Sequence, residues 1–402
     1  MIDFHAIKAA AARIKAEIYE SPLVHTKTLS RLTGNEIYLK LENLQMTGSF
    51  KERGALNRIL TMTAEEKRRG VIAASAGNHG QAVAYHAALR GIPVQIWMPR
   101  YTPLIKLDAT REYGADVVLC GNSYDEAYEA AVQRSLETNA TFLHAFDDEG
   151  VIAGQGTIGL EMLAQNPRLE VVVTPVGGGG LIGGIACAIK GLNPNVEVIG
   201  VQTSRLPSMR AALEHRQPVS VPAASTMADG IAIRRAGKLT LPLVSEYVDR
   251  VVTVDEEEIA EAVLVLLERE KTLAEGAGAV ALAAVLQGKT GHSGKKIAVL
   301  ISGGNLDVNL LSRIIEQGLV RDGRRLRVRV RLPDHPGALE GLSSVIARMG
   351  ANIVETLHNR AHYGVSLSET AIDITMETRG RQHVTELLAE LKNSGYEFAI
   401  VQ

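Results

Sequence analysis

The chain has 402 residues, of which 46% are hydrophobic and 22% are charged, and its formal net charge is -2. This length provides for two or three domains with a large core, and the near-neutral charge argues against a nucleic-acid partner. A membrane span is not expected, because the longest uncharged run, residues 171–189, contains a proline and six glycines. Two isolated cysteines, Cys120 and Cys187, and an amphipathic N-terminus unlike a signal peptide are typical of a cytoplasmic protein.

Helices and short apolar strands alternate along residues 4–318. Apolar stripes predict helices over residues 4–18 and 81–90. Apolar runs predict strands over residues 36–41, 71–74, 94–98, 116–120, 171–176, 196–201 and 296–301. Because near-continuous apolar strands separated by helices are typical of parallel sheets covered on both faces, we predict an α/β fold with open parallel sheets.

A charged stretch, residues 321–325, is predicted to be a linker between two domains. Beyond it, strand-like and helix-like apolar periods predict the order strand, helix, strand, strand, helix, strand over residues 326–402. This βαββαβ order is typical of a ferredoxin-like domain. The first strand carries Arg327, Arg329 and Arg331 on its polar side, which would face solvent or another subunit, or form an anion-binding surface.

The tract of residues 48–54 places Lys51 between two glycines, with Arg53 two residues further on. An amine attacks a carbonyl only after it loses its proton, and enclosure near another cation favours that loss. Because the tract shows no periodic apolar pattern, we expect a loop. It predicts a Schiff-base lysine, with an ordinary surface lysine as the alternative.

Four consecutive glycines, residues 177–180, lie between a predicted strand and a predicted helix. Without side chains, several backbone amides can converge on one phosphate, and the helix N-terminus adds partial positive charge. A formal GxGxxG match through Gly178, Gly180 and Gly183 also permits a dinucleotide site. The next strand, however, ends in Gln202 and lacks the acid that would bind a ribose, so we predict a phosphate site.

Two more turns follow predicted strands. In residues 75–80 the backbone amides could bind a carboxylate and Asn78 could donate to a ring hydroxyl, although Ser75 or Asn78 could instead cap the helix. His79 is equally compatible with contact to a ligand and with packing in the interior. Ser302 begins the other turn, and because ligands gather beyond the carboxyl ends of parallel strands, we expect these groups, the glycines and Lys51 to meet at one crevice.

Five segments together resemble the fold-type II pyridoxal-phosphate enzymes, which have the tryptophan synthase β-like fold, and among them the threonine ammonia-lyases. They are residues 49–54, 75–80, 177–181, 274–279 and 302–305. The resemblance implies a catalytic domain over residues 1–320, with a smaller subdomain at about 46–150 inserted in the larger. It also implies that pyridoxal 5'-phosphate is bound by Lys51, Phe50, Asn78, Gly177, Gly178, Gly179, Gly180, Leu181 and Ser302.

The same resemblance implies a pocket for the substrate carboxylate, lined by Ser75, Ala76, Gly77 and His79. Glu275 either faces this site or caps a helix, and Asp229 either supports the pocket or forms a turn. The implied reaction converts L-threonine to 2-oxobutanoate and ammonia, with L-serine to pyruvate as a side activity. Lys51 is the expected base for the Cα proton, and Ser302 at the ring nitrogen would favour prompt elimination.

Three alternatives stay open. Serine dehydratase and serine racemase are related, but Ala76 lacks the hydroxyl that would serve the opposite face of Cα in a racemase. The positions of a racemase-like metal site hold Gln202, Leu206 and Ser208, which supply too few hard oxygens, so no metal is expected. A non-catalytic amino-acid sensor belongs to another class, and the intact set of Lys51, Asn78 and Ser302 argues against it.

Residues 326–402 resemble an ACT regulatory domain through the loop 333–337 and the segment 350–353. The resemblance implies an amino-acid effector, isoleucine or valine, in an enzyme of isoleucine biosynthesis. The implied effector-binding residues are Asp334, His335, Gly337 and Asn352. A purely structural dimerisation module is the alternative, and either reading predicts a homo-oligomer, a dimer or a tetramer.

Overall fold

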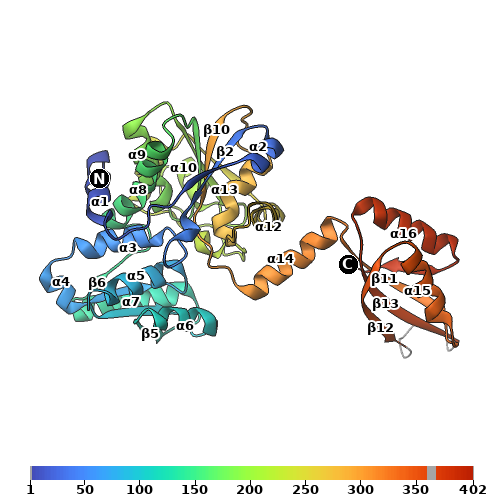
Figure 1. The fold of residues 1–402 in the computed structure, drawn as a ribbon. Coiled ribbons are helices and arrows are strands. Elements are labelled where there is room, and N and C mark those ends of the chain that lie inside the picture. The colour runs from blue at the N-terminus through green and yellow to red at the C-terminus, as the bar shows by residue number, and fades with distance from the viewer. Residues whose placement is uncertain (1, 360–367, 402) are drawn as a thin grey trace. The chain divides into compact units, whose positions relative to one another are not determined.

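The computed structural model describes residues 2–359 and 368–401. Its contacts separate it into two compact units, Met1–Asp307 and Val308–Gln402, and Figure 1 shows them with many of their helices and strands labelled. Within the described residues, no helix is both long and apolar enough to cross a membrane.

A six-stranded sheet forms the larger subdomain of the first unit. In spatial order its strands are β1 (Leu23–Thr26), β2 (Glu36–Leu41), β10 (Lys296–Ile301), β7 (Val171–Pro175), β8 (Glu197–Thr203) and β9 (Arg250–Val254). All neighbours are parallel except β1 and β2. Every residue of β7 is buried, because helices cover both faces of a parallel sheet.

Helices and short turns surround this larger sheet (Figure 1). They are α1 (Phe4–Ile14), α2 (Lys27–Thr33), η1 (Glu42–Leu44), α8 (Glu149–Gln165), α9 (Gly180–Leu192), α10 (Ser208–His215), η2 (Asp229–Ile231), α11 (Thr240–Tyr247), α12 (Glu256–Val265), η3 (Leu266–Glu270) and α13 (Gly276–Leu286). Both α9 and α13 pack against the central strands β7 and β8.

A four-stranded parallel sheet forms the smaller subdomain. Its spatial order is β5 (Asp116–Leu119), β4 (Val94–Met98), β3 (Val71–Ala74) and β6 (Thr141–Phe142). The helices of this part of the chain are α3 (Lys51–Leu60), α4 (Ala64–Arg69), α5 (Asn78–Ala88), α6 (Leu104–Glu112) and α7 (Tyr124–Thr138). The prediction of an α/β fold with two parallel-sheet subdomains is confirmed.

Element boundaries differ from the sequence prediction where an apolar pattern is weak. The prediction missed β1, β6 and β9, which are short or only partly buried. The first helix ends at Ile14, four positions before its predicted end. In contrast, β4 and β10 have the predicted bounds, because their residues alternate or run continuously in the core.

Charged residues join α3 to the larger subdomain. The guanidinium of Arg53, which is 0% exposed, donates to both oxygens of Glu42 at 2.8 Å and to those of Glu161 at 2.6 and 2.8 Å. Lys40 completes this buried ion cluster, with its Nζ 2.6 Å from Glu161. Burial alone would raise the pKa of Glu42, but its pairing with Arg53 lowers that pKa overall.

The second unit begins with α14 (Val308–Arg321), followed by an antiparallel sheet with two helices. Its remaining elements are β11 (Arg325–Pro333), α15 (Ala338–Arg348), β12 (Asn352–Asn359), β13 (Glu369–Glu377), α16 (Arg381–Asn393) and β14 (Glu397–Ile400). The strand order β12-β13-β11-β14 is that of a ferredoxin-like fold, so the predicted fold class of this region is confirmed. The stretch predicted to be a linker, residues 321–325, includes the end of α14 and the start of β11.

The arginine stripe of β11 is partly ion-paired. The guanidinium of Arg329 contacts the carboxylate of Asp373 on β13 at 2.6 Å, and that of Arg327 contacts it at 3.4 Å. Asp373 is only 4% exposed, although it lies on the face of the sheet opposite the helices. The side chains of Arg327 and Arg329 nevertheless stay 38% and 40% exposed, and Arg331 is exposed, so this face is both ion-paired and solvated.

Candidate active site

Lys51 is the first residue of α3, so the prediction that it lies in a loop is wrong. The preceding tract is held by the turn after β10: Phe50 N–H donates to Ser302 O at 3.0 Å, and Gly304 N–H donates to Gly48 O at 2.9 Å. These long-range bonds, which no local pattern reveals, fix the point at which the helix begins. The Lys51 amine lies 5.1 Å from the centre of the Phe50 ring.

Burial controls the protonation of Lys51. Its Nζ donates to Ala145 O at 2.9 Å, and burial lowers its pKa from 10.5 to about 8, although the nearby Glu275 opposes this shift. Arg53, the cation expected to promote deprotonation, instead belongs to the buried ion cluster with Glu42. Of the two predicted influences on Lys51, enclosure lowers its pKa, whereas Arg53 is not among the causes of the shift.

The glycine turn after β7 leaves no room for side chains. A Cβ on Gly178 would overlap the ring of Phe146, and one on Gly180 would lie 2.5 Å from Phe146 O. Gly179 has φ +100°, which strains other residues, and precedes α9. The first amides of a helix lack partners within the helix, so this turn and the start of α9, including Leu181, present donors suited to a phosphate.

The segment that follows β6 connects Lys51 to the glycine turn. Ala145 accepts the Lys51 hydrogen bond, and Phe146 packs against Gly178. His144 fixes this segment, because its Nδ1 accepts from the N–H groups of Phe146 and Asp147 at 3.2 and 2.9 Å. Sequence reasoning missed these residues, since they belong to no recognisable motif and act through their position.

The turn after β3 is built from backbone rather than from a side-chain cap. Gly77 occupies the position before α5, which has no side-chain capping bond, and its N–H donates to Ser75 Oγ at 3.2 Å. Neither Ser75 nor Asn78 therefore caps the helix. Ala76 is half-buried in this turn, and the first amides of α5 are free to bind a carboxylate.

His79 points into the smaller subdomain. Its buried ring lies with Nε2 2.9 Å from Leu143 O, and burial lowers its pKa to about 3. The imidazole is therefore neutral and packed in the interior, as one of the two sequence interpretations held. A contact between this ring and a substrate carboxylate is not supported, and only the backbone amide of His79 lies on the helix start.

Glu275 and Asn78 meet at the centre of the site. Asn78 Nδ2 donates to Glu275 Oε1 at 2.7 Å, and Glu275 is 5% exposed. Although Glu275 precedes α13, it makes no side-chain capping bond, so it faces the site. Burial, followed by the charge of Asp229, raises the pKa of Glu275 to about 8, well above the ordinary value of a carboxyl group.

Ser302 and Asp229 complete the set. Ser302 follows β10, is almost fully buried, and its Oγ donates to Ala277 O at 3.4 Å. Asp229 begins the short turn η2 and pairs with Lys106 of α6 at 2.7 Å, so it is both a turn residue and a neighbour of the site. The structure thus brings together residues from the ends of β3, β7 and β10.

The predicted effector residues are not brought together within one copy of the second unit. Asp334, His335 and Gly337 lie in the turn after Pro333, at the end of β11. Asn352 pairs in register with Glu377, which itself pairs with Arg325 at the start of β11. These two groups therefore occupy opposite ends of the sheet.

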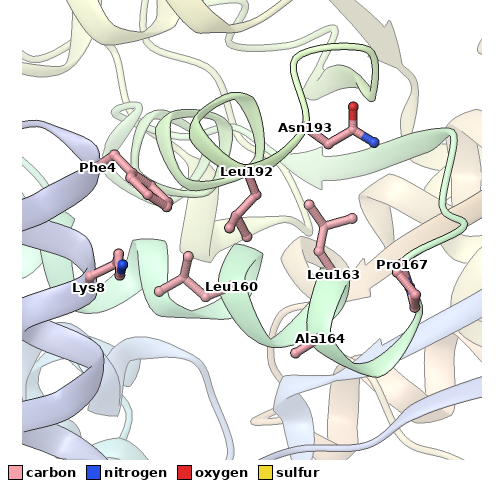
Figure 2. Close-up of a pocket in the computed structure, with 8 residues that line it drawn as sticks. All are labelled: Phe4, Lys8, Leu160, Leu163, Ala164, Pro167, Leu192 and Asn193. Carbon is pink, nitrogen blue, oxygen red and sulfur yellow. The ribbon is translucent and has the colours of Figure 1, made fainter.

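An apolar groove and the positions considered for a metal are two further features of the first unit. An apolar groove between α1, α8 and the end of α9 (Figure 2) contains none of the predicted site residues. The positions considered for a racemase-like metal, Gln202, Leu206 and Ser208, are buried. No group of three or more His, Cys, Asp or Glu side chains arranged for a metal occurs in residues 2–359 and 368–401.

The fold and the site define a class of enzymes that bind a phosphorylated aldehyde at a buried lysine. Residues 14–303 match the family described as pyridoxal-phosphate dependent enzyme, and the chain belongs to this family. An L-threonine ammonia-lyase of Thermotoga maritima is 51% identical over 401 residues, covering 100% of both chains. One of Geobacter sulfurreducens is 48% identical over 397 residues, covering 98% of each.

Solved structures show the same architecture. Threonine deaminase isoform 2 of Solanum lycopersicum, in its processed form, matches with a TM-score of 0.76 at 36% identity, covering 79% of this chain and 88% of that one. Maize serine racemase matches with a TM-score of 0.74 at 32% identity, covering 79% and 98%. The fold alone therefore does not separate elimination from racemisation.

The residues present fit pyridoxal 5'-phosphate, the cofactor of the family. The side-chain-free glycine turn offers amides to a phosphate, and Lys51 offers a buried amine to an aldehyde. Asn78 and Ser302 place an amide and a hydroxyl at the same crevice. The flat ring of the cofactor could pack near Phe50, which lies beside the Lys51 amine.

The pKa of Lys51 gives a pH prediction. Because burial lowers this pKa to about 8, half of the Lys51 amines should be neutral near that pH, and the neutral fraction should fall at lower pH. The rate at which cofactor-free protein forms its visible band with pyridoxal phosphate should therefore rise with a midpoint near 8. A midpoint at the ordinary lysine value would contradict burial as the activating cause.

Proposed function

We propose that this enzyme is an L-threonine ammonia-lyase that forms 2-oxobutanoate and ammonia, with L-serine to pyruvate as a side activity. The observation that carries the proposal is the position of the Lys51 amine, which donates to Ala145 O at 2.9 Å, next to the Phe146 that packs against the glycine turn suited to a phosphate. Burial also lowers the pKa of this amine to about 8. The substrate is supported by the full-length relatives described as L-threonine ammonia-lyases.

The bound cofactor supplies electron withdrawal from the substrate Cα, which makes the Cα proton acidic. The amides of residues 177–181 would hold the cofactor phosphate, Asn78 the ring oxygen and Ser302 the ring nitrogen. The first amides of α5 would hold the substrate carboxylate. Lys51 Nζ takes the proton from Cα, and the hydroxyl leaves Cβ as water once it has received a proton.

Steady-state formation of 2-oxo acid from L-threonine, L-serine and bulkier 3-hydroxy amino acids tests this assignment. The highest kcat/KM is expected with L-threonine, and a lower value with L-serine. A protein that turns over none of these substrates, while still binding the cofactor, would contradict the proposed activity.

Ala76 underlies a prediction about racemisation. A side chain without a dissociable proton cannot serve the face of Cα opposite Lys51, so the wild-type enzyme should form little D-serine. Ala76→Ser is expected to raise D-serine formation relative to pyruvate by about tenfold or more, since a positioned proton donor contributes at least that much. Chiral analysis of the products measures this ratio. Ala76→Gly is the matched control. Equal ratios of D-serine to pyruvate in the two variants would exclude a proton-donating role for the side chain at this position.

We further propose that isoleucine or valine binds the second unit and regulates the enzyme in isoleucine biosynthesis. Either effector should shift the half-saturating threonine concentration of the full-length enzyme by about fivefold or more. Asp334→Ala should reduce this shift, whereas Asp322→Ala, which changes an acid before β11, should retain it. Saturation curves that do not respond to either amino acid would contradict regulation.

We also propose a cytoplasmic homo-oligomer, a dimer or a tetramer. Because the predicted effector residues lie at opposite ends of one sheet, two copies of the second unit would be needed to bring both groups to one ligand. Analytical ultracentrifugation, with and without isoleucine, tests the association. A monomer under all conditions would rule out a shared effector site.

A further inference from the structure

The carboxamide of Asn78 is held from two sides. Its Nδ2 donates to Glu275 Oε1 at 2.7 Å, and its Oδ1 accepts from Asn305 Nδ2 at 2.8 Å. An amide that meets a donor at its oxygen and an acceptor at its nitrogen has one preferred orientation, because the reversed amide would face Asn305 with donor against donor. The orientation of Asn78 is therefore set by its neighbours.

Asn305 reaches Asn78 from the turn after β10 and also binds the tract before Lys51. Its Nδ2 donates to Thr47 O at 2.7 Å, and Gln81 Oε1 of α5 lies 3.3 Å away. A Cβ on Gly48, which has φ +74°, would overlap Asn305 Oδ1, so this glycine makes room for the side chain. Asn305 thus joins the segments that carry Lys51 and Asn78 to the segment that carries Ser302.

The amide nitrogen of Asn78 has two N–H groups. Glu275 accepts from one of them, which leaves the second for the site. A hydrogen bond from this N–H to a ring oxygen would stabilise the anionic form of that oxygen. If the amide were reversed, a lone pair of Oδ1 would face the ring oxygen in its place and repel it.

We propose that Asn305 is a positioning residue, which orients the Asn78 amide so that its second N–H faces the ring oxygen of the cofactor. The inference rests on the proposed function, because it requires that Asn78 binds this oxygen. It adds Asn305 as a residue that acts on the site indirectly. Asn305 touches neither the substrate nor the cofactor in this account, and it acts through Asn78.

Asn305→Asp tests the proposal, because a carboxylate keeps the shape of the side chain but can only accept hydrogen bonds. The variant should favour the reversed Asn78 amide. The affinity of cofactor-free protein for pyridoxal phosphate should fall about ten- to a hundredfold, as expected for a lost hydrogen bond to a charged group. The pH midpoint of the visible band should move upward, because the ring oxygen loses a donor that favours its anionic form.

Asn43→Asp is the matched control. Asn43 also donates through Nδ2 to a backbone carbonyl, Leu273 O at 2.9 Å, and packs beside Gly304. Within the described part of the chain, its amide bonds to Thr272 and Leu273 and not to Asn78. It should change the band midpoint and the cofactor affinity by less than about twofold. Thermal unfolding of each cofactor-free variant shows whether any loss of affinity is simply a loss of folded protein.

The outcomes separate the inference from the proposed function. If wild-type protein shows no visible band with pyridoxal phosphate, the proposed function fails. If wild-type protein binds normally and Asn305→Asp shifts neither midpoint nor affinity more than Asn43→Asp, the positioning role is wrong. Equal losses in Asn305→Asp and Asn305→Gln, which retains the amide donor on a longer stem, would also overturn it, since the donor would then be irrelevant.

Discussion

Lys51→Ala is expected to reduce kcat for L-threonine by about 10⁴-fold or more, because the substitution removes both the attachment point of the cofactor and the base for the Cα proton. The same variant should lose the visible band of the bound cofactor. Single-turnover and steady-state assays of 2-oxobutanoate measure the first effect, and absorbance measures the second.

Lys51→Arg provides the matched control for charge and bulk. A guanidinium keeps a cation on the first turn of α3 but cannot form the covalent bond to an aldehyde or act as a base at neutral pH. It should therefore be as inactive as Lys51→Ala while retaining more of the folded stability. Substantial turnover in either variant would mean that another group removes the Cα proton.

Arg53→Ala is expected to lower the free energy of unfolding of the first unit by about 3–5 kcal/mol. Glu42 is 0% exposed and Arg53 is its bidentate ion-pair partner, so the variant leaves a buried carboxylate without that partner. Urea unfolding, followed by the fluorescence of Trp97, measures the change. Because α3 begins at Lys51, the activity of the variant should fall along with its stability.

Arg58→Ala is the control for Arg53, since it changes an arginine on the same helix. Arg58 pairs with Asp148 at 3.3 Å, and both side chains are partly exposed, so its loss should cost no more than about 1 kcal/mol. Equal losses of stability from the two arginine variants would contradict the role of the buried ion cluster.

The ion cluster also makes stability depend on pH. The pKa of Glu42 is lowered in the folded protein, so the contribution of Glu42 to stability is present above its unfolded pKa and is lost as the pH falls.

Short-range patterns predicted much of the fold and part of the site. Strand β10 was predictable because apolar residues run through it, and β4 because buried apolar residues alternate along it. The glycine turn was predictable because close backbone approach excludes side chains. Ser302 and Asn78 were located by turns that follow strands. In each instance the signal lies within a few consecutive residues, which a sequence displays directly.

Features that depend on distant partners were not predictable in this way. The helical start at Lys51 depends on bonds from the turn after β10, and Arg53 turns away from Lys51 because it pairs with Glu42 and Glu161. The roles of Phe146 and Asn305 depend on segments remote in the chain. The burial that lowers the Lys51 pKa is likewise a property of the assembled fold, and Arg53, the cation that was expected to help, pairs elsewhere.

The covalent attachment point of the cofactor shows whether Lys51 is the Schiff-base lysine. The enzyme with bound pyridoxal phosphate is reduced with borohydride, digested, and examined by mass spectrometry for the peptide that carries the cofactor. We expect modification at Lys51, and none when the cofactor is omitted. Modification at another lysine such as Lys40, or no modification at all, would contradict it.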